Sequence, residues 1–235
     1  MRSVSQAISR LTYNDTIPNG LTLLCGASGV GKTIFAQQFA YETLLENGRV
    51  LWITTEELPS TLRSSMLDFG WNCDRYEKEG KLQVFDAVSP ARLGISENIG
   101  RGVLGLDPTG MLIVVSEQLR QETPGEKGNF LIIIDSISRL LLSCEAKPVV
   151  DFVACMSSRL ENYRVKGLAT VSEGAHDEKI LNALTFSSTG TIRFRINEAA
   201  GARSRQFRIE TLRGKRHEDK WKDYRITNTG LDMEV

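Results

Sequence analysis

The chain has 235 residues, 41% of them hydrophobic and 25% charged, which suits one sizeable α/β domain with ample apolar material for a core. Its 29 basic and 29 acidic residues give a formal net charge of zero, so nucleic acid or an anionic membrane could be bound only through a local patch. The four cysteines form no CxxC pair and there are two histidines, which argues against a structural zinc site or a disulfide framework.

The N-terminal residues 1–12 lack the apolar run that follows the basic residue of a secretory signal. No apolar run elsewhere approaches the ~20 residues that a helix needs to span a bilayer. Together with the scattered cysteines, these features lead us to expect a cytoplasmic protein without membrane insertion.

Apolar runs of strand length alternate with longer stretches of helical period, which predicts a largely parallel central sheet flanked by helices. The expected strands lie at 21–25, 50–54, 81–87, 131–134 and 168–171, and the expected helices at 33–46, 59–69, 109–121 and 149–163. The structure of the glycine-containing connection 86–109 stays open. After residue 190, strand-like segments at 191–196, 206–211 and 224–227, with a turn at 198–204, predict a C-terminal antiparallel extension of the sheet. We expect a single domain over residues 1–235, with its core from about residue 20 onward.

A glycine-rich loop follows the first expected strand and matches the GxxxxGK[ST] pattern at every position. It consists of Gly26, Ala27, Ser28, Gly29, Val30, Gly31, Lys32 and Thr33. The glycines allow the backbone to wrap closely around an anion, and the N-terminus of the following helix points its positive end at phosphates. In such a loop Lys32 bridges the β- and γ-phosphates of ATP and Thr33 offers its hydroxyl to Mg²⁺. The pattern therefore predicts a P-loop that binds ATP and Mg²⁺.

The second group on the metal side of the site is expected to be an acidic residue at the end of a buried strand. Asp135 directly follows the apolar segment 131–134 and fits this position, where a carboxylate orients Mg²⁺. The alternative is that Asp135 caps the next helix.

Hydrolysis also needs a carboxylate that polarises the attacking water. Glu56 and Glu57 follow the strand at 50–54, which we expect beside the loop-bearing strand in the simplest layout. The residue after Asp135 is Ser136, so the base that many P-loop classes place there is missing. That absence favours a RecA-type arrangement, in which the strand after the P-loop helix supplies the catalytic glutamate. The alternative is a solvated acidic pair near a helix N-terminus, where negative charge is favourable.

These segments resemble single-domain members of the KaiC-like branch of the RecA superfamily of P-loop ATPases. The matching segments are GASGVGKTIFAQQFAYETL, TTEELP and LDFGW within 21–71, then IDSI at 134–137, VSE at 171–173, LRG at 212–214 with His217, and YRIT at 224–227 with Gly230. The resemblance covers most of residues 20–235. It implies a RecA-like fold, a ring that is usually a hexamer, and ATP at the subunit interface. It also makes Glu57, with Glu56 beside it, the water-activating pair and Arg213 a cation that reaches the γ-phosphate of the neighbouring subunit.

Three departures from the family pattern bear on activity. Members that hydrolyse ATP as a ring often have a lysine two residues before the arginine, where this chain has Thr211. The best-known member has two such domains in tandem, and this chain has one. Gly174 follows Glu173 where a basic residue is common, which argues against a sensor at that position.

Two weaker signals have simpler alternatives. The C-terminal quarter is basic around Trp221 and Tyr224, which could indicate a nucleic-acid stripe, although we favour a surface that meets a neighbouring subunit. Ser187, Ser188 and Thr189 lie near where the clock member of the family is phosphorylated, but a polar turn explains them more simply.

The leading functional hypothesis is therefore an ATP-hydrolysing ring protein with slow turnover that signals to an unidentified regulatory protein. The second is an ATP-binding scaffold without turnover, similar to FlaH-like accessory proteins of the archaeal motility machinery, which Thr211 favours. The third is a recombinase-like DNA-binding paralogue, which ranks last because the net charge is zero and no helical DNA-binding module fits before residue 21.

Overall fold

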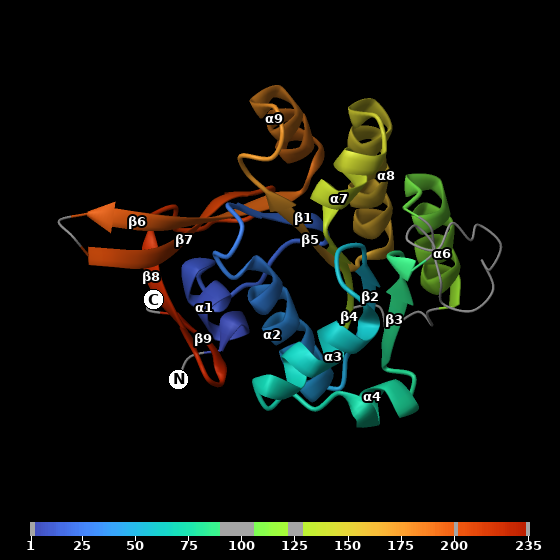
Figure 1. The fold of residues 1–235 in the computed structure, drawn as a ribbon, viewed down its shortest axis with the longest axis horizontal. Coiled ribbons are helices and arrows are strands. Elements are labelled where there is room, and N and C mark those ends of the chain that lie inside the picture. Colours follow the sequence, from blue (N-terminus) through green and yellow to red (C-terminus); the bar gives the residue numbers. More distant parts are fainter. Residues whose placement is uncertain (1–2, 90–105, 122–128, 200–201, 234–235) are drawn as a thin grey trace.

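The structure is a computed structural model that describes residues 3–89, 106–121, 129–199 and 202–233. Figure 1 labels its helices and strands. In chain order these are α1 (Val4–Leu11), β1 (Gly20–Gly26), α2 (Lys32–Leu45), β2 (Arg49–Thr54), α3 (Pro59–Asp68), α4 (Asp74–Lys78), β3 (Leu82–Asp86), α6 (Pro108–Gln121), β4 (Phe130–Asp135), α7 (Ile137–Ser143), α8 (Ala146–Tyr163), β5 (Lys166–Ser172), α9 (Glu178–Ser187), β6 (Gly190–Ala199), β7 (Ala202–Leu212), β8 (Lys222–Thr227) and β9 (Gly230–Met233).

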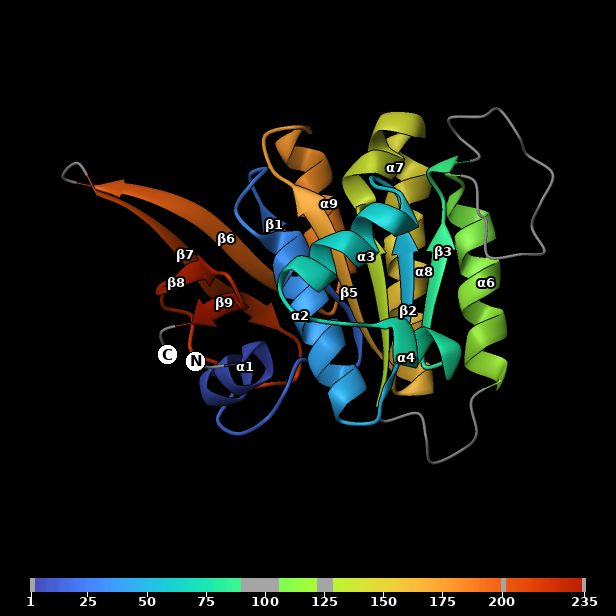
Figure 2. The ribbon, with the colours of Figure 1, turned by 60° about the horizontal axis from the view of Figure 1, so that its bottom comes forward.

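The strands of the described residues form one sheet in the order β3-β2-β4-β5-β1-β6-β7-β8-β9. The first six strands of this order, β3, β2, β4, β5, β1 and β6, pair in parallel. The last three, β7, β8 and β9, continue the sheet by antiparallel pairing. Figure 2 shows β6 and β7 as a long ribbon that extends away from the helical layers. This architecture confirms the predicted α/β fold with its parallel centre and antiparallel C-terminal extension.

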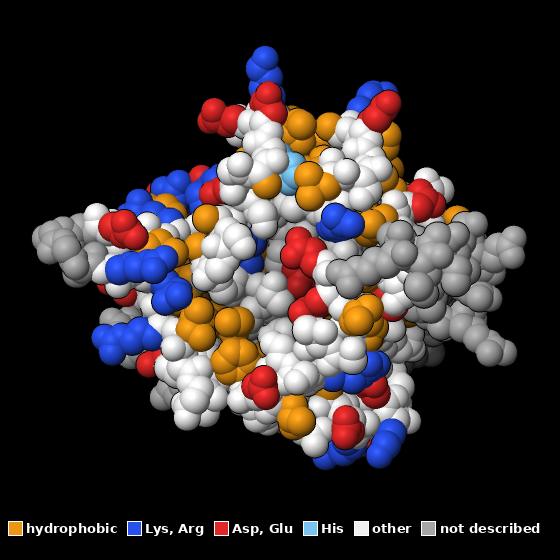
Figure 3. All heavy atoms as spheres, in the orientation of Figure 1, with side chains coloured by type: hydrophobic (Ala, Val, Ile, Leu, Met, Phe, Trp, Pro, Cys, Tyr) orange, Lys and Arg blue, Asp and Glu red, His pale blue; other side chains and the backbone are white. Residues whose placement is uncertain are grey.

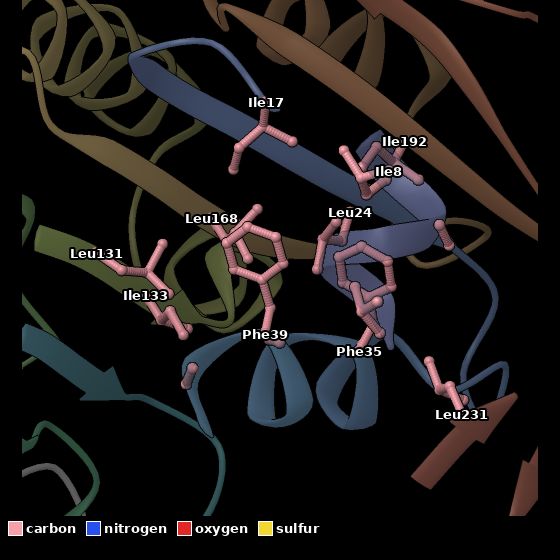
Figure 4. Close-up of a cluster of buried hydrophobic side chains, with 14 of the residues drawn as sticks. Ile8, Ile17, Leu24, Phe35, Phe39, Leu131, Ile133, Leu168, Ile192 and Leu231 are labelled. Atoms are coloured by element: carbon pink, nitrogen blue, oxygen red, sulfur yellow. The ribbon is translucent and has the colours of Figure 1, made fainter. Parts of the chain in front are cut away.

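Helices cover both faces of the parallel strands (Figures 1 and 2). One core cluster joins α1, α2 and α3 to the sheet, and the other joins α6, α7, α8 and α9 to its opposite face. Along β4 the side chains alternate between the two clusters, with Leu131 and Ile133 in the first and Ile132 and Ile134 in the second. Figure 4 shows Phe35 and Phe39 of α2 pointing at the first of these faces. A strand that is buried on both faces must be apolar throughout, which explains the continuous apolar run of β4.

The predicted strand neighbour of β1 was wrong. We expected β2 beside the loop-bearing strand, but β4 and β5 lie between β2 and β1. Parallel strands that are buried on both faces carry similar apolar sequences, so composition does not fix their order. The order nevertheless places the end of β2 against the end of β4, since Thr54 pairs with Asp135.

Several elements were not predicted: α1, α4, α7, α9 and β9. Helix α1 forms because Ser3 and Gln6 make a capping box at its start. The carboxylate of Glu42 in α2 also accepts hydrogen bonds from the backbone N–H groups of Val4 and Ser5, at 2.9 and 2.7 Å. The turn predicted at 198–204 is much shorter, because β6 continues to Ala199 and β7 begins at Ala202. Most of the connection 86–109 lies outside the described residues.

Within the described parts of the chain, no helix combines the length and the apolar character that a membrane span requires.

Candidate functional site

The P-loop connects β1 to α2 and has the backbone that its glycines predict. Gly29 and Gly31 have φ values of 77° and 96°, a left-handed region that side-chain-bearing residues rarely adopt. Gly31 caps α2 without any side-chain hydrogen bond. No side chain therefore caps the N-terminus of this 14-residue helix, and its first backbone N–H groups can bind an anion.

Lys32 directs its ammonium group into the loop. Its Nζ atom donates hydrogen bonds to the backbone carbonyls of Gly26 and Ala27, both at 2.8 Å. The residue is 7% exposed, and burial lowers the pKa of the ammonium group while the charges of Asp135 and Glu56 act in the opposite direction. The loop thus holds one buried cation, which suits a phosphate ligand, beside two carboxylates, which suit a metal ion.

Asp135 ends β4 and is 3% exposed. Its carboxylate accepts hydrogen bonds from the hydroxyls of Thr170 and Thr33. Burial raises the pKa of Asp135 to about 6, and the charge of Glu56 adds to this, while the Thr170 and Thr33 hydrogen bonds and Lys32 oppose it. A buried carboxylate in contact with the threonine of a P-loop offers the hard oxygen ligands that Mg²⁺ prefers. These residues therefore fit a magnesium ion.

The two glutamates lie beside this group in different environments. Glu56 accepts a hydrogen bond from the Ser136 hydroxyl and lines the cleft. Glu57 is half-buried, and its Oε1 atom has no hydrogen-bond partner among the described residues. Burial, followed by the charges of Asp135 and Glu56, raises the pKa of Glu57. Both carboxylates therefore sit at the β2–β4 edge of the site, with Glu56 facing the cleft.

Two threonine hydroxyls hold the turn after β2, and one of them ties it to the end of β4. Thr55 donates from Oγ1 to the Ser136 carbonyl at 2.8 Å, and Thr54 donates to the Glu57 carbonyl at 2.6 Å. The peptide bond between Asp135 and Ser136 is cis. These contacts fix where the chain turns after each strand and so fix the positions of the glutamates and of Asp135.

These groups surround one cleft. It is lined by Ser28, Gly29, Gly31, Lys32, Thr33, Ile34, Glu56, Asp135, Thr170 and Ser172. Figure 3 shows acidic side chains gathered beside the hollow at the centre of this face. The structure thus brings together the P-loop, Asp135 and Glu56, whereas Glu57 is not among the described residues that line the cleft.

Arg213 lies at the opposite end of β1 from the P-loop. Its backbone N–H donates to the Thr189 carbonyl, and the Thr189 N–H donates to the Leu21 carbonyl, each at 2.9 Å. The seven residues of β1 separate this place from the P-loop by about 20 Å. The Arg213 side chain instead donates to the Phe186 carbonyl, with its guanidinium carbon 5.9 Å from the Phe186 ring centroid. Arg213 is therefore not part of the cleft of its own chain.

The segment that was compared with phosphorylated hydroxyls is mostly buried. Ser187 ends α9, while Ser188 and Thr189 are buried. The Ser188 hydroxyl donates to the carbonyls of Thr185 and Gly190, at 2.9 and 3.0 Å. These contacts support the simpler interpretation of a polar turn between α9 and β6.

The basic C-terminal stretch is partly neutralised by carboxylates. Arg193 contacts both Glu173 and Glu210, and Arg208 contacts Glu210 at 2.9 Å. The guanidinium carbons of Arg195 and Arg208 lie 3.9 and 4.8 Å from the Trp221 ring centroid. Sequence analysis missed this network and the contact from Thr170 to Asp135, because both depend on strand register rather than on spacing along the chain.

The comparison with protein families agrees with this geometry. A family model described as an ATPase, KaiC, matches residues 8–234. A UPF0273 protein of Thermotoga maritima is 26% identical over 220 residues, which cover 90% of this chain and 86% of the relative. A UPF0273 protein of Methanopyrus kandleri is 30% identical over 227 residues, with 94% and 86% covered.

A longer relative shares the same domain. The circadian clock oscillator protein KaiC 1 of Synechocystis is 27% identical over 237 aligned positions, which cover 99% of this chain and 44% of that protein. The match of the family model over nearly the whole chain, on a P-loop α/β fold, is decisive. The chain belongs to the KaiC family of ATPase domains.

Proposed function

We propose that this chain binds ATP with Mg²⁺ in the cleft and hydrolyses it slowly at the subunit interfaces of a ring-like, hexameric homo-oligomer. The observation that carries the proposal is the convergence of Lys32, Thr33, Asp135 and Glu56 on one cleft at the N-terminus of α2. Since the strands of the described residues form one sheet, we further propose that residues 1–235 act as a single domain.

Each group in the cleft has a role that its chemistry supports. Lys32 and the backbone N–H groups of residues 26–33 would bind the β- and γ-phosphates. Thr33 and Asp135 would hold Mg²⁺, which when bound neutralises charge on the phosphates. Glu56 and Glu57 would orient the attacking water and accept its proton. The half-buried carboxyl of Glu57, whose pKa is raised, and the cleft-facing carboxylate of Glu56 are both suited to accepting a proton.

The place of Arg213 supports a site that two subunits complete. Its position about 20 Å from the P-loop of its own chain keeps it from the same nucleotide. Beside it, Phe186 is 79% exposed, and an exposed aromatic side chain of this size often marks an interface. In a head-to-tail ring the Arg213 edge of one subunit can meet the cleft of the next.

Two features support slow turnover linked to a regulatory partner. Thr211 is exposed near Arg213, so this edge offers a hydroxyl where many ring-forming members offer a second cation. The Synechocystis relative is named as a circadian clock oscillator protein, and a slow ATPase that reports its nucleotide state would suit a signalling role. The regulatory protein itself is unidentified.

The same threonine favours a second candidate, a scaffold that binds ATP without turnover. This candidate predicts that assembly depends on ATP while phosphate release stays at background. A recombinase-like role has less support, because carboxylates pair with basic residues of the C-terminal stretch: Glu210 with Arg208, Asp15 with Lys215 and Glu218 with Lys222. Binding to single-stranded DNA that weakens steeply with salt would revive it.

Phosphate release and light scattering, measured in the same samples with ATP and Mg²⁺, test the proposal. A ring ATPase gives ATP-dependent assembly together with turnover. Assembly without turnover would favour the scaffold, and turnover by a monomer at all protein concentrations would contradict the interface site.

Replacing Lys32 by alanine is expected to weaken ATP binding by about 10²-fold or more, because removing one partner of a buried charge pair costs about 2–5 kcal/mol. Isothermal titration calorimetry with ATP measures this change. The matched control is Lys147→Ala, which removes an exposed lysine of α8 that lies 4.0 Å from Asp151. Equal ATP affinity in the two variants would remove Lys32 from the phosphate site.

A further inference from the structure

A buried hydroxyl on β5 contacts the proposed metal ligand from the neighbouring strand. Thr170 is 1% exposed, and its Oγ1 atom donates a hydrogen bond to Oδ1 of Asp135. Thr170 also lines the cleft that contains the P-loop. Nothing in the motifs of the sequence pointed to this residue.

The register of the sheet builds this contact into the fold. Ile134 of β4 pairs with Ala169 of β5, so Asp135 and Thr170 lie at the same level one residue further along. Side chains at the same level of parallel strands point to the same face. That face is the one that α2 covers, where Ile133 and Leu168 belong to the core (Figure 4). The donor of this hydrogen bond therefore lies on one core strand and its acceptor on the next, and neither lies in a loop.

The Thr170 hydroxyl can orient the buried carboxylate of Asp135. The hydrogen bond from Thr170 gives Asp135 a fixed outer-shell partner of the kind that orients metal ligands. The same hydrogen bond occupies Oδ1 and fixes the rotation of the carboxylate, which leaves Oδ2 for other ligands. Thr33 is expected to give its own hydroxyl to the metal, so Thr170 is the donor that stays on Asp135 when a metal binds.

We infer that Thr170 is a positioning residue for the metal site, which holds the Asp135 carboxylate turned toward the ion beside the P-loop. The inference rests on the proposed function, since it concerns the same cleft. Thr170 acts through Asp135 and takes no part in the chemical step itself.

The test measures metal binding directly, with Mn²⁺ as the probe in place of Mg²⁺. Electron paramagnetic resonance gives the affinity for Mn²⁺ of the full chain saturated with ADP, in wild type, Thr170→Val and Thr170→Ser. Valine keeps the shape of the side chain and removes the hydroxyl, whereas serine keeps the hydroxyl. Second-sphere partners of this kind change metal affinity by about 10–100-fold, so we expect a loss of that size in Thr170→Val and recovery of most of it in Thr170→Ser.

Thr22→Val is the matched control. Thr22 is a buried threonine of β1 in the same sheet, and its Oγ1 atom has no hydrogen-bond partner among the described residues. It pairs with Leu168, two residues before Thr170 on β5. Thr22→Val is expected to bind Mn²⁺ as wild type does, which separates the lost hydrogen bond from a general effect of valine in the sheet.

The outcomes separate this inference from the proposed function. Wild-type affinity for Mn²⁺ in Thr170→Val, or an equal loss in Thr170→Ser, overturns the role of Thr170 and leaves the ATP site standing. If the wild-type protein binds ADP but does not bind Mn²⁺, the metal site is overturned, and this inference with it.

Discussion

Replacing Arg213 by alanine is expected to leave ATP binding unchanged and to lower phosphate release by about 10³-fold or more, to background for a slow enzyme. In the proposed ring, the Arg213 guanidinium of one subunit would offset charge that develops on the γ-phosphate bound by the next, so its loss should affect turnover far more than binding. Phosphate release at saturating ATP and calorimetric ATP affinity measure the two effects separately.

The control for this variant is Arg216→Ala, which removes an exposed arginine three residues further along the chain. It changes the net charge equally but leaves the Arg213 contact with Phe186 in place. Normal phosphate release by Arg213→Ala, with Arg216→Ala also active, would exclude Arg213 from the reaction.

The double replacement of Glu56 and Glu57 by glutamine is expected to lower phosphate release by about 10²–10⁴-fold, the usual contribution of a general base. Glutamine keeps the shape of each side chain but accepts a proton poorly, so ATP should still bind. The single variants Glu56→Gln and Glu57→Gln then show how much each glutamate contributes to the rate of phosphate release. Glu56 faces the cleft, so Glu56→Gln is expected to cause the larger loss of the two.

Glu178→Gln, an exposed position in the first turn of α9, is the matched control for the change from glutamate to glutamine. If the double variant turns over ATP at the wild-type rate, the water-activating group must lie elsewhere. In that case the arrangement of carboxylates around Asp135 would serve binding alone.

The local parts of the fold were predictable because their signals are local. The P-loop pattern fixes its own backbone through glycines such as Gly29 and Gly31, and an apolar run such as β4 identifies a buried strand. Helix α1 also carried a readable signal, since Ser3 and Gln6 form a capping box before apolar residues at helical spacing. These residues are enough to predict α1 from the sequence.

The remaining features depend on long-range packing. The order of β2, β4 and β5 depends on how the helices pack on the sheet. The three strands have similar apolar sequences, so their composition does not determine that order. The contact from Thr170 to Asp135 needs the register between β4 and β5. The place of Arg213 needs the turn after β7 to lie against the start of β1. The sequence therefore predicted the members of the site better than their spatial relations.

The central claim, that one subunit completes the site of the next, is tested most directly by mixing two inactive variants. Arg213→Ala keeps an intact cleft, and the Glu56→Gln, Glu57→Gln double variant keeps an intact arginine. When equal amounts of the two variants assemble at random with ATP, about a quarter of the interfaces should combine an intact cleft with an intact arginine. The account predicts that phosphate release returns to about that fraction of the wild-type rate. Mixed assemblies that stay inactive would contradict a site shared between subunits.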